Sequence, residues 1–214
     1  MLKLFYAPNA CSLGAHIALE ETGVPFEAVR VDLKSGAQNQ PEYRRINPKG
    51  RVPALITDRG TLTESPAILG YIAETFPEAK LAPLGDSFAM ADMQSFNLFL
   101  ATSVHVAFAH VGRPARYADG EVAHAAMKAK AQDALDEYFG LIESRLADGR
   151  PWVLGEAYSV SDPYLYVFSR WFAERGLGHP ENFPRVAAHR ERVAARPAAQ
   201  RAFATEGLVP AAAA

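Results

Sequence analysis

Cys11 has the clearest chemical potential, and it is the single cysteine of the 214 residues. It follows residues 2–6, whose apolar pattern predicts a buried strand, and precedes Leu13, Ile17 and Leu19 at helical spacing. The first N–H groups of a helix lack helical partners, and the helix dipole there favours a thiolate. We therefore predict a functional sulfur at a strand-to-helix turn, although a small buried side chain is the competing interpretation. Without a second cysteine, any redox cycle needs a thiol from another molecule.

Other side chains could activate a thiol. Tyr6 ends the first strand and Ser12 follows the cysteine, although core packing and helix capping are their ordinary roles. His105 lies in a helical pattern, and an unperturbed histidine pKa of about 6.5 suits proton transfer. Its ordinary interpretation is a helix histidine bonded to a carbonyl or water. His110 is five residues further on and faces elsewhere, so the histidines predict no metal site.

Residues 48–74 predict a loop, a hairpin and a helix. An apolar run at residues 54–57 and a second run at 61–63 read as strands, and residues 58–60 supply the turn between them. Taken alone, this is an ordinary ββα unit.

The ends of that unit could hold a ligand. Ser65 stands where an N-cap belongs, with Pro66 as the first helical residue. A helix start that offers Glu64, Ser65 and free N–H groups suits a carboxylate. Val52, before Pro53, is expected to be extended and could pair its backbone with a ligand peptide.

The first part of the chain predicts an α/β domain. Strands at residues 2–6 and 26–33 flank a helix stopped by Gly23, a polar loop covers residues 34–40, and residues 41–46 form one or two helical turns. With the hairpin and the helix after it, the order is β-α-β-α-β-β-α. This is the thioredoxin-like arrangement.

The rest of the chain predicts helices alone. We expect an α/β domain over residues 1–79, a linker over 80–86 and an all-α domain over 87–214. We expect one long helix over residues 87–111 and a second over 121–146. A capping box at Ser159–Asp162 should open a buried helix. A last helix should cover residues 183–195, and residues 210–214 should form a frayed end. Pro163 would sit fourth in its helix and delete the first backbone bond.

Composition excludes several kinds of partner. The net charge of −2 argues against nucleic acid, because phosphate binding favours a basic excess. No apolar run approaches the ~18 residues that a membrane span needs. A single cysteine and a strand-like start favour the cytoplasm.

Several motifs resemble soluble glutathione S-transferases. The pattern NPKGRVPAL, TLTESPAIL and YI looks like the second half of their thioredoxin-like domain, and the S-x-x-D box resembles the start of their core helix. The stretch YAPNACSL is similar to the bacterial beta class, which carries cysteine at this position. The resemblance implies the glutathione transferase fold, an α/β thioredoxin-like domain followed by an all-α domain.

The resemblance also implies a set of site residues. In the family, the residue before a cis-proline and a Glu-Ser pair hold the peptide of glutathione, and a helix histidine faces its sulfur. The implied residues are Cys11 and His105 for catalysis and Lys34, Val52, Pro53, Glu64, Ser65, Thr102 and Ser103 for glutathione. Lys34 is only a candidate, because its loop is shorter here than in the family. Some members carry an asparagine about two turns before the helix histidine, and Asn97 is one residue away from that position. Thr102 and Ser103 would contact glutathione from the neighbouring subunit of a dimer.

The implied activity is conjugation of glutathione to hydrophobic electrophiles by a cytoplasmic homodimer, with glutathione as co-substrate and no metal. We expect Phe108, Tyr164 and Phe168 to line the apolar pocket for the second substrate. Thiol–disulfide exchange through Cys11 is a further possibility. Two adjacent thiolates repel, so Cys11 should stay protonated when glutathione is ionised. The alternatives are a non-enzymatic ligand-binding or regulatory protein, and a glutathione-dependent reductase or dehalogenase.

Overall fold

The computed structural model describes residues 1–209, so the frayed end expected at residues 210–214 lies outside the described part. The strands are β1 (Leu2–Tyr6), β2 (Phe26–Arg30), β3 (Ala54–Thr57) and β4 (Gly60–Thr63). The α-helices are α1 (Ser12–Thr22), α2 (Pro41–Ile46), α3 (Ser65–Thr75), α4 (Ser87–Phe99), α5 (His105–Gly112), α6 (Glu121–Arg145), α7 (Ser161–Glu174), α8 (Pro184–Ala194) and α9 (Pro197–Glu206). Short 3₁₀ turns occupy Ala37–Asn39, Pro77–Ala79, Pro114–Arg116 and Pro180–Asn182.

The four strands form one mixed sheet in the order β2-β1-β3-β4. Strand β1 pairs with β2 in parallel, with Leu4 opposite Ala28, and with β3 antiparallel, with Leu4 opposite Leu55. Strands β3 and β4 form the predicted hairpin. Helix α1 is the crossover that a parallel β1–β2 pair requires. The thioredoxin-like order expected from the sequence is confirmed.

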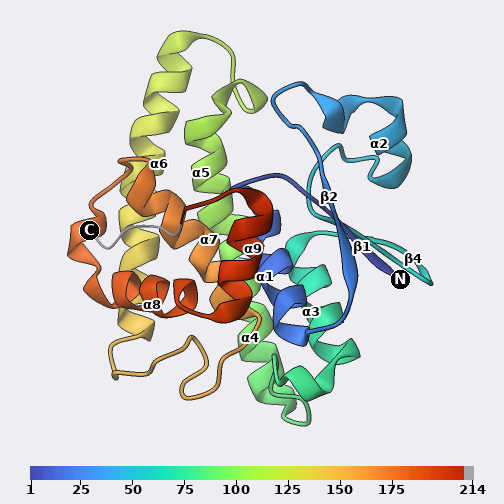
Figure 1. Cartoon of the computed structure of the whole chain (residues 1–214). Coiled ribbons are helices and arrows are strands. Elements are labelled where there is room, and N and C mark those ends of the chain that lie inside the picture. Colours follow the sequence, from blue (N-terminus) through green and yellow to red (C-terminus); the bar gives the residue numbers. More distant parts are fainter. Residues whose placement is uncertain (210–214) are drawn as a thin grey trace.

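The two faces of the sheet are covered differently because alternate side chains of a strand point to opposite faces. Leu4 and Tyr6 point into the large core beneath α1 and α3, which continues into the helical part of the chain. Phe5 points to the other face and joins a small cluster with Tyr43 of α2. Figure 1 shows α1 and α3 between the sheet and the helical bundle.

Helices α4 to α9 form the second part of the molecule (Figure 1). Helix α7 is its centre, because all its residues from Ser161 to Phe172 are buried. It contacts α1, α4 and α8, so the two parts share one interface rather than a loose linker. None of the helices in the described part of the chain is long and apolar enough to cross a membrane.

Several predicted boundaries were wrong. Strand β2 ends at Arg30 rather than at residue 33, and the helix expected over residues 87–111 is divided by a π-helical segment at Leu100–Val104. Ser65 is the first residue of α3 and Glu64 is its N-cap, so Ser65 does not cap the helix. The domain boundaries at residues 79 and 86 stay predictions.

Two further differences concern the helical domain. Helix α7 begins at Ser161, so Pro163 is its third residue, where no helical hydrogen bond is lost. Helix α9 was not predicted, although Pro197 at its start and Gly207 in the left-handed conformation after its end are ordinary boundary signals. Its alanine-rich sequence carries only a narrow apolar stripe.

Candidate active site

A cavity of about 1010 Å³ lies between the sheet domain and the helical domain. The loop before α1, the segment before β3 and the start of α3 form one wall. The start of α5, the turn after it and one side of α7 form the other. The side chains that the sequence singles out and that line it are Cys11, Lys34, Val52, Pro53, Glu64, Ser65, His105, Phe108 and Tyr164.

Cys11 is the N-cap residue of α1 and is partly buried in the cavity wall. Its thiol donates a hydrogen bond to the Val52 carbonyl at 3.2 Å. Burial raises the pKa of Cys11 to about 11, against the smaller opposing effects of Arg113 and Ser65. The expected thiolate is therefore wrong for the free protein: desolvation outweighs the helix N-terminus, and the side chain is a neutral hydrogen-bond donor.

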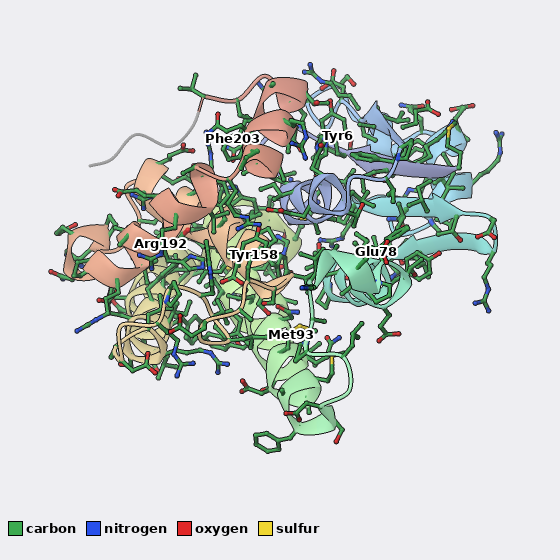
Figure 2. All side chains as sticks on the ribbon, turned by 60° about the horizontal axis from the view of Figure 1, so that its bottom comes forward. Tyr6, Glu78, Met93, Tyr158, Arg192 and Phe203 are labelled. Atoms are coloured by element: carbon green, nitrogen blue, oxygen red, sulfur yellow. The ribbon has the colours of Figure 1, made fainter. Side chains whose placement is uncertain are left out.

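The two rivals of Cys11 face away from the cavity. The Ser12 hydroxyl is fully buried, donates to the Ala7 carbonyl at 3.3 Å and accepts from the Ala7 N–H at 3.2 Å, so it fixes the turn before α1. The Tyr6 hydroxyl donates to the Thr205 carbonyl at 3.3 Å, and Figure 2 shows Tyr6 near the helix that carries Phe203. Burial raises the pKa of Tyr6. Both hydroxyls are used in holding the fold.

The segment before β3 presents the backbone that the sequence predicts for a ligand peptide. The Val52–Pro53 bond is cis, as the resemblance implies. The Tyr43 hydroxyl and the Asn47 amide both donate to the Arg51 carbonyl at 2.6 Å, which fixes the loop in front of Val52.

Glu64 has a φ of 71°, a left-handed conformation that is uncommon outside glycine and concentrates at functional sites. Its carboxylate makes no capping bond and instead pairs with the Lys49 ammonium at 2.6 Å. The first N–H groups of α3 are thus free of a side-chain cap at the cavity wall. Ser65 is buried beside them. This corner can receive a carboxylate and an ammonium group together.

His105 is the first residue of α5, directly after the π-helical segment, a feature that is frequent at functional sites. Its ring lies against Phe168 at 5.4 Å and Trp171 at 5.5 Å between centroids. Burial, helped by Arg113 and Arg51, lowers the pKa of His105 to about 4. The imidazole is therefore neutral at physiological pH and can donate one hydrogen bond across the cavity.

Not every expected residue reaches the cavity. Thr102 is exposed and donates its hydroxyl to the Leu98 carbonyl at 2.9 Å, and Ser103 also lies outside the lining. Phe168 is fully buried behind His105 and does not line the cavity. Asn97 is buried and accepts from the Ser161 hydroxyl at 2.8 Å, so it joins α4 to α7.

The lining is far more basic than the sequence reading expected. Its carboxylates are Asp32 and Glu64, and its basic side chains are Arg30, Lys34, Lys49, Arg51, Arg113, Arg116 and Arg175. Lys49 and Arg51 stand inside the NPKGRVP motif and could have been noticed there. The arginines at 113, 116 and 175 lie far from it, and the fold brings them to the same cavity. Beside them, Trp171 and Tyr117 add aromatic surface to the lining.

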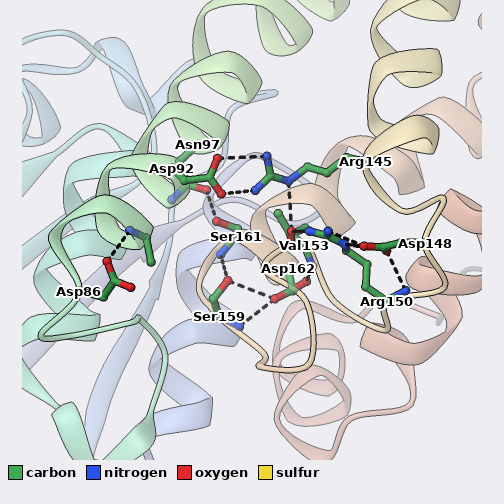
Figure 3. Close-up of polar contacts among 11 residues, drawn as sticks. Asp86, Asp92, Asn97, Arg145, Asp148, Arg150, Val153, Ser159, Ser161 and Asp162 are labelled. Carbon is green, nitrogen blue, oxygen red and sulfur yellow. Dashed lines mark hydrogen bonds and ion pairs between the residues drawn. The ribbon is translucent and has the colours of Figure 1, made fainter.

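A buried polar network holds α7 where Tyr164 and Trp171 can line the cavity (Figure 3). The Asp162 carboxylate accepts from the Ser159 N–H at 2.7 Å, the Val153 N–H at 2.8 Å and the His189 ring at 2.9 Å. The predicted bond from the Ser159 N–H to the Asp162 carboxylate is confirmed, but the Ser159 hydroxyl accepts from the Ser161 N–H at 3.3 Å rather than from the Asp162 N–H.

Among residues 1–209 no group of three or more histidine, cysteine or acidic side chains is placed to hold a metal ion. The reactive and charged groups that the cavity offers are a thiol, an imidazole, carboxylates, ammonium groups and guanidinium groups.

Comparisons with known proteins agree with this architecture. Residues 1–74 match the family described as "Glutathione S-transferase, N-terminal domain", and residues 99–197 match "Glutathione S-transferase, C-terminal domain". The chain is 36% identical to glutathione S-transferase GstA of Escherichia coli O157:H7 over 210 residues, which cover 97% of this chain and 100% of the relative.

Solved structures give the same result. A glutathione transferase homologue from Sulfitobacter, with bound glutathione, has a TM-score of 0.90 at 36% identity and is matched over 98% of this chain and 99% of its own. The bacterial beta class glutathione S-transferase of Sphingomonas chungbukensis has a TM-score of 0.84 at 38% identity, over 97% of this chain and 100% of its own.

Proposed function

Because the chain belongs to the glutathione S-transferase family, we propose that its cavity binds glutathione and that the enzyme joins the glutathione sulfur to an electrophilic carbon. One observation carries the assignment of roles: Cys11, Val52, the Glu64–Ser65 pair and His105 come from four separate segments and line the same cavity. A protein that only binds a ligand would not need a thiol and a neutral imidazole beside it.

The sheet domain binds the peptide. Val52 pairs its backbone with the peptide as an added strand would, and its carbonyl oxygen, which accepts from the Cys11 thiol, has a second lone pair for that purpose. Glu64, Ser65 and the first N–H groups of α3 receive the γ-glutamyl end, whose ammonium and carboxylate match an acidic side chain and a helix N-terminus. Lys34, which lines the same cavity, attracts the negatively charged peptide. The thiol then points toward Cys11 and His105.

His105 polarises the thiol rather than removing its proton. A base whose conjugate acid has a pKa of about 4 is a poor proton acceptor for a thiol of ordinary pKa, about 8.5. As a neutral donor it stabilises the thiolate by a hydrogen bond, and the basic lining supplies the compensating positive charge. The proton leaves to solvent before the sulfur attacks.

Cys11 serves as the second donor to the thiolate. Its pKa of about 11 keeps it protonated near neutral pH, which avoids two adjacent negative charges. For the same reason Cys11 is a slow nucleophile, so a reductase or dehalogenase that acts through its thiolate is not favoured. A mixed disulfide with glutathione stays available only when an oxidant is supplied.

The second substrate occupies the space between His105 and the aromatic side chains Phe108, Tyr164 and Trp171. A homodimer in the cytoplasm fits the family and the single cysteine. In such a dimer the exposed Thr102 and the neighbouring Ser103 would contact glutathione of the other subunit.

The test is conjugation of glutathione to a neutral chlorodinitrobenzene, with the uncatalysed rate subtracted. We expect turnover by the wild type and a loss of about tenfold or more in kcat for His105→Ala, larger than its effect on glutathione affinity. Retention on immobilised glutathione without turnover would support the binding-protein alternative instead. For Cys11→Ala, intact-protein mass spectrometry after treatment with oxidised glutathione should find no adduct, and glutathione affinity should stay within about tenfold.

A further inference from the structure

Three arginines of the helical domain line the cavity beyond His105. Arg113 follows the last residue of α5, Arg116 lies in the 3₁₀ turn Pro114–Arg116, and Arg175 follows the last residue of α7. All three are exposed on the solvent side. They come from different elements and reach the same cavity.

These arginines lack a carboxylate partner within the described part of the chain. Other arginines of the helical domain pair with carboxylates, as Arg145 does with Asp92 and Arg196 with Glu21, whereas Arg113, Arg116 and Arg175 take part in no ion pair. The closest charged group to Arg175 along the chain is Glu174, which already binds Arg170 at 2.9 Å.

Their charges instead repel one another. Burial is the largest cause that lowers the pKa of Arg116, and the positive charge of Arg113 is the second. Burial and the charge of Arg113 also lower the pKa of Arg175. Holding several positive charges together without a paired anion costs free energy. Binding of an anionic ligand would offset that cost.

The arginine group belongs to the helical domain, whereas Val52, Glu64 and Ser65, which are assigned to the peptide of glutathione, belong to the sheet domain. Arg113 lies eight residues after His105, about 12 Å along the helix axis at 1.5 Å per residue. The charge of Arg113 nevertheless acts on both Cys11 and His105, so the group is close to the reacting sulfur and can hold a second substrate beside it.

Aromatic side chains lie beside the arginines. The Arg175 guanidinium stacks over the Trp171 ring at 4.3 Å and Phe108 packs edge-on against Trp171 at 5.5 Å, but both rings are almost fully buried. Tyr117, next to Arg116, also lines the cavity and is 45% exposed. An exposed ring beside a cluster of guanidinium groups fits a planar body with a carboxylate at one end.

We propose that the preferred electrophile of this enzyme is an aromatic or otherwise planar carboxylate, whose anionic end binds Arg113, Arg116 and Arg175 and whose body lies against Tyr117. The proposal rests on the proposed function and names the substrate class of that site. The family resemblance implies a hydrophobic electrophile, whereas we propose an anionic electrophile with an apolar body.

A matched pair of substrates tests it: 4-chloro-3,5-dinitrobenzoate and its methyl ester. In both, the glutathione sulfur bonds to the ring carbon, chloride leaves with the electrons of the carbon–chlorine bond, and the thiol proton goes to solvent. Each kcat/KM is divided by the uncatalysed rate constant of the same substrate. We expect the wild type to favour the carboxylate by about tenfold or more.

Variants show which residues cause the preference for the carboxylate. Arg113→Gln should lower kcat/KM for the carboxylate by about tenfold and for the ester by no more than about threefold. The charge-matched control Lys128→Gln, on the exposed side of α6, should leave both substrates unaffected. Salt from about 0.01 to 1 M should weaken the carboxylate reaction of the wild type far more than that of Arg113→Gln.

Each other outcome has a definite meaning. Equal losses for carboxylate and ester would mean that Arg113 acts on the glutathione thiolate or on the fold rather than on the substrate carboxylate, and would overturn the proposal. A raised KM for glutathione, with the preference kept, would assign the arginines to a carboxylate of glutathione and also overturn it. A wild type that conjugates the ester without preferring the carboxylate overturns this proposal alone, and one that conjugates neither removes the proposed function as well.

Discussion

Two sulfur atoms meet in the cavity when glutathione is bound, and their protonation states decide which of them reacts. Cys11 is held protonated because burial raises its pKa to about 11, so the glutathione sulfur is the one that ionises near neutral pH. The N-terminus of α1 lowers the pKa of the Cys11 thiol by less than the loss of water around the thiol raises it.

Alkylation of Cys11 tests this assignment in the free enzyme. Compared with a thiol of pKa 9.0, a pKa of about 11 leaves a thiolate fraction smaller by about a hundredfold near pH 8. The rate of modification by iodoacetamide, followed by mass spectrometry, should rise about tenfold per pH unit up to about pH 10. A rate that levels off near pH 8 would show that Cys11 is an ordinary or activated thiol.

His105 makes a second prediction, through stability. Its pKa is about 4 in the folded protein and 6.5 in the unfolded chain, so below pH 6.5 the unfolded chain takes up a proton that the folded protein refuses. Its stabilising contribution is complete above pH 6.5 and is lost as the pH falls toward 4. The loss should be about 2 kcal/mol, because the partly exposed ring is screened by solvent.

Urea unfolding of the wild type and His105→Asn at pH 7 and pH 4.5 measures that contribution. The variant should lose less stability than the wild type between the two pH values. Equal losses would mean that the ring is as easily protonated in the folded protein as in the unfolded chain.

At the scale of elements, the contact between α1 and α7 fixes the distance between the two walls of the cavity. A Cβ at Gly14 would lie 3.2 Å from the Tyr164 Cα and 3.3 Å from the Pro163 carbonyl oxygen, and backbone atoms cannot move aside cheaply. Gly14→Ala should therefore separate α1 from α7 and destabilise the protein by about 1–3 kcal/mol.

Gly140→Ala is the matched control. Gly140 is also helical, and its added Cβ would lie at an ordinary 3.9 Å from the Phe183 ring. This substitution should stabilise α6 by about 0.5–1 kcal/mol, because alanine is the better helix former. Urea denaturation of both variants gives the comparison, and a Gly14→Ala protein as stable as Gly140→Ala would show that α1 and α7 tolerate a wider spacing.

The elements themselves were largely predictable from the sequence, because their boundaries depend on local chemistry. Gly23 ends α1 in the left-handed conformation, and the turn from Thr57 to Gly60 joins β3 and β4 as expected. The π-helical segment before His105 was not predictable, since residues 87–111 keep one helical pattern with no local signal for an extra residue in the turn. That segment helps to decide where the histidine points.

At the scale of the whole molecule, the unpredicted helix α9 positions the loop that carries Cys11. Glu206, near the end of α9, accepts from the Asn9 N–H at 3.1 Å and binds the buried His16 ring at 2.9 Å. The Trp171 indole donates to the Asn9 carbonyl at 3.0 Å. Figure 1 shows α9 beside α1, although they are far apart in the sequence.

Glu206→Ala should therefore act on both stability and catalysis. It leaves the Asn9 N–H and the buried His16 ring without their partner, which should cost about 3–5 kcal/mol. Conjugation should slow as the Asn9 loop loosens. The control Glu191→Ala removes an exposed carboxylate of α8 and should stay within about 0.5 kcal/mol of the wild type. A Glu206→Ala protein as stable as that control would remove α9 from the account of the site.

The site was predictable only in part, because some of its residues are brought together by contacts between distant parts of the chain. Cys11, Glu64 and Ser65 lie in short motifs that can be read from neighbouring residues. The importance of Glu206, and the meeting of Arg113 with Arg175, arise from contacts across the whole fold and have no local signature.

Activation of glutathione by this cavity is tested most directly by the pKa of the glutathione thiol in the complex, measured by the ultraviolet absorbance of the thiolate as the pH is raised. We expect a value at least about one unit below the ordinary thiol pKa of about 8.5, with part of the shift lost in His105→Ala. A thiol that titrates in the complex as it does in free solution would contradict the claim that this cavity activates glutathione.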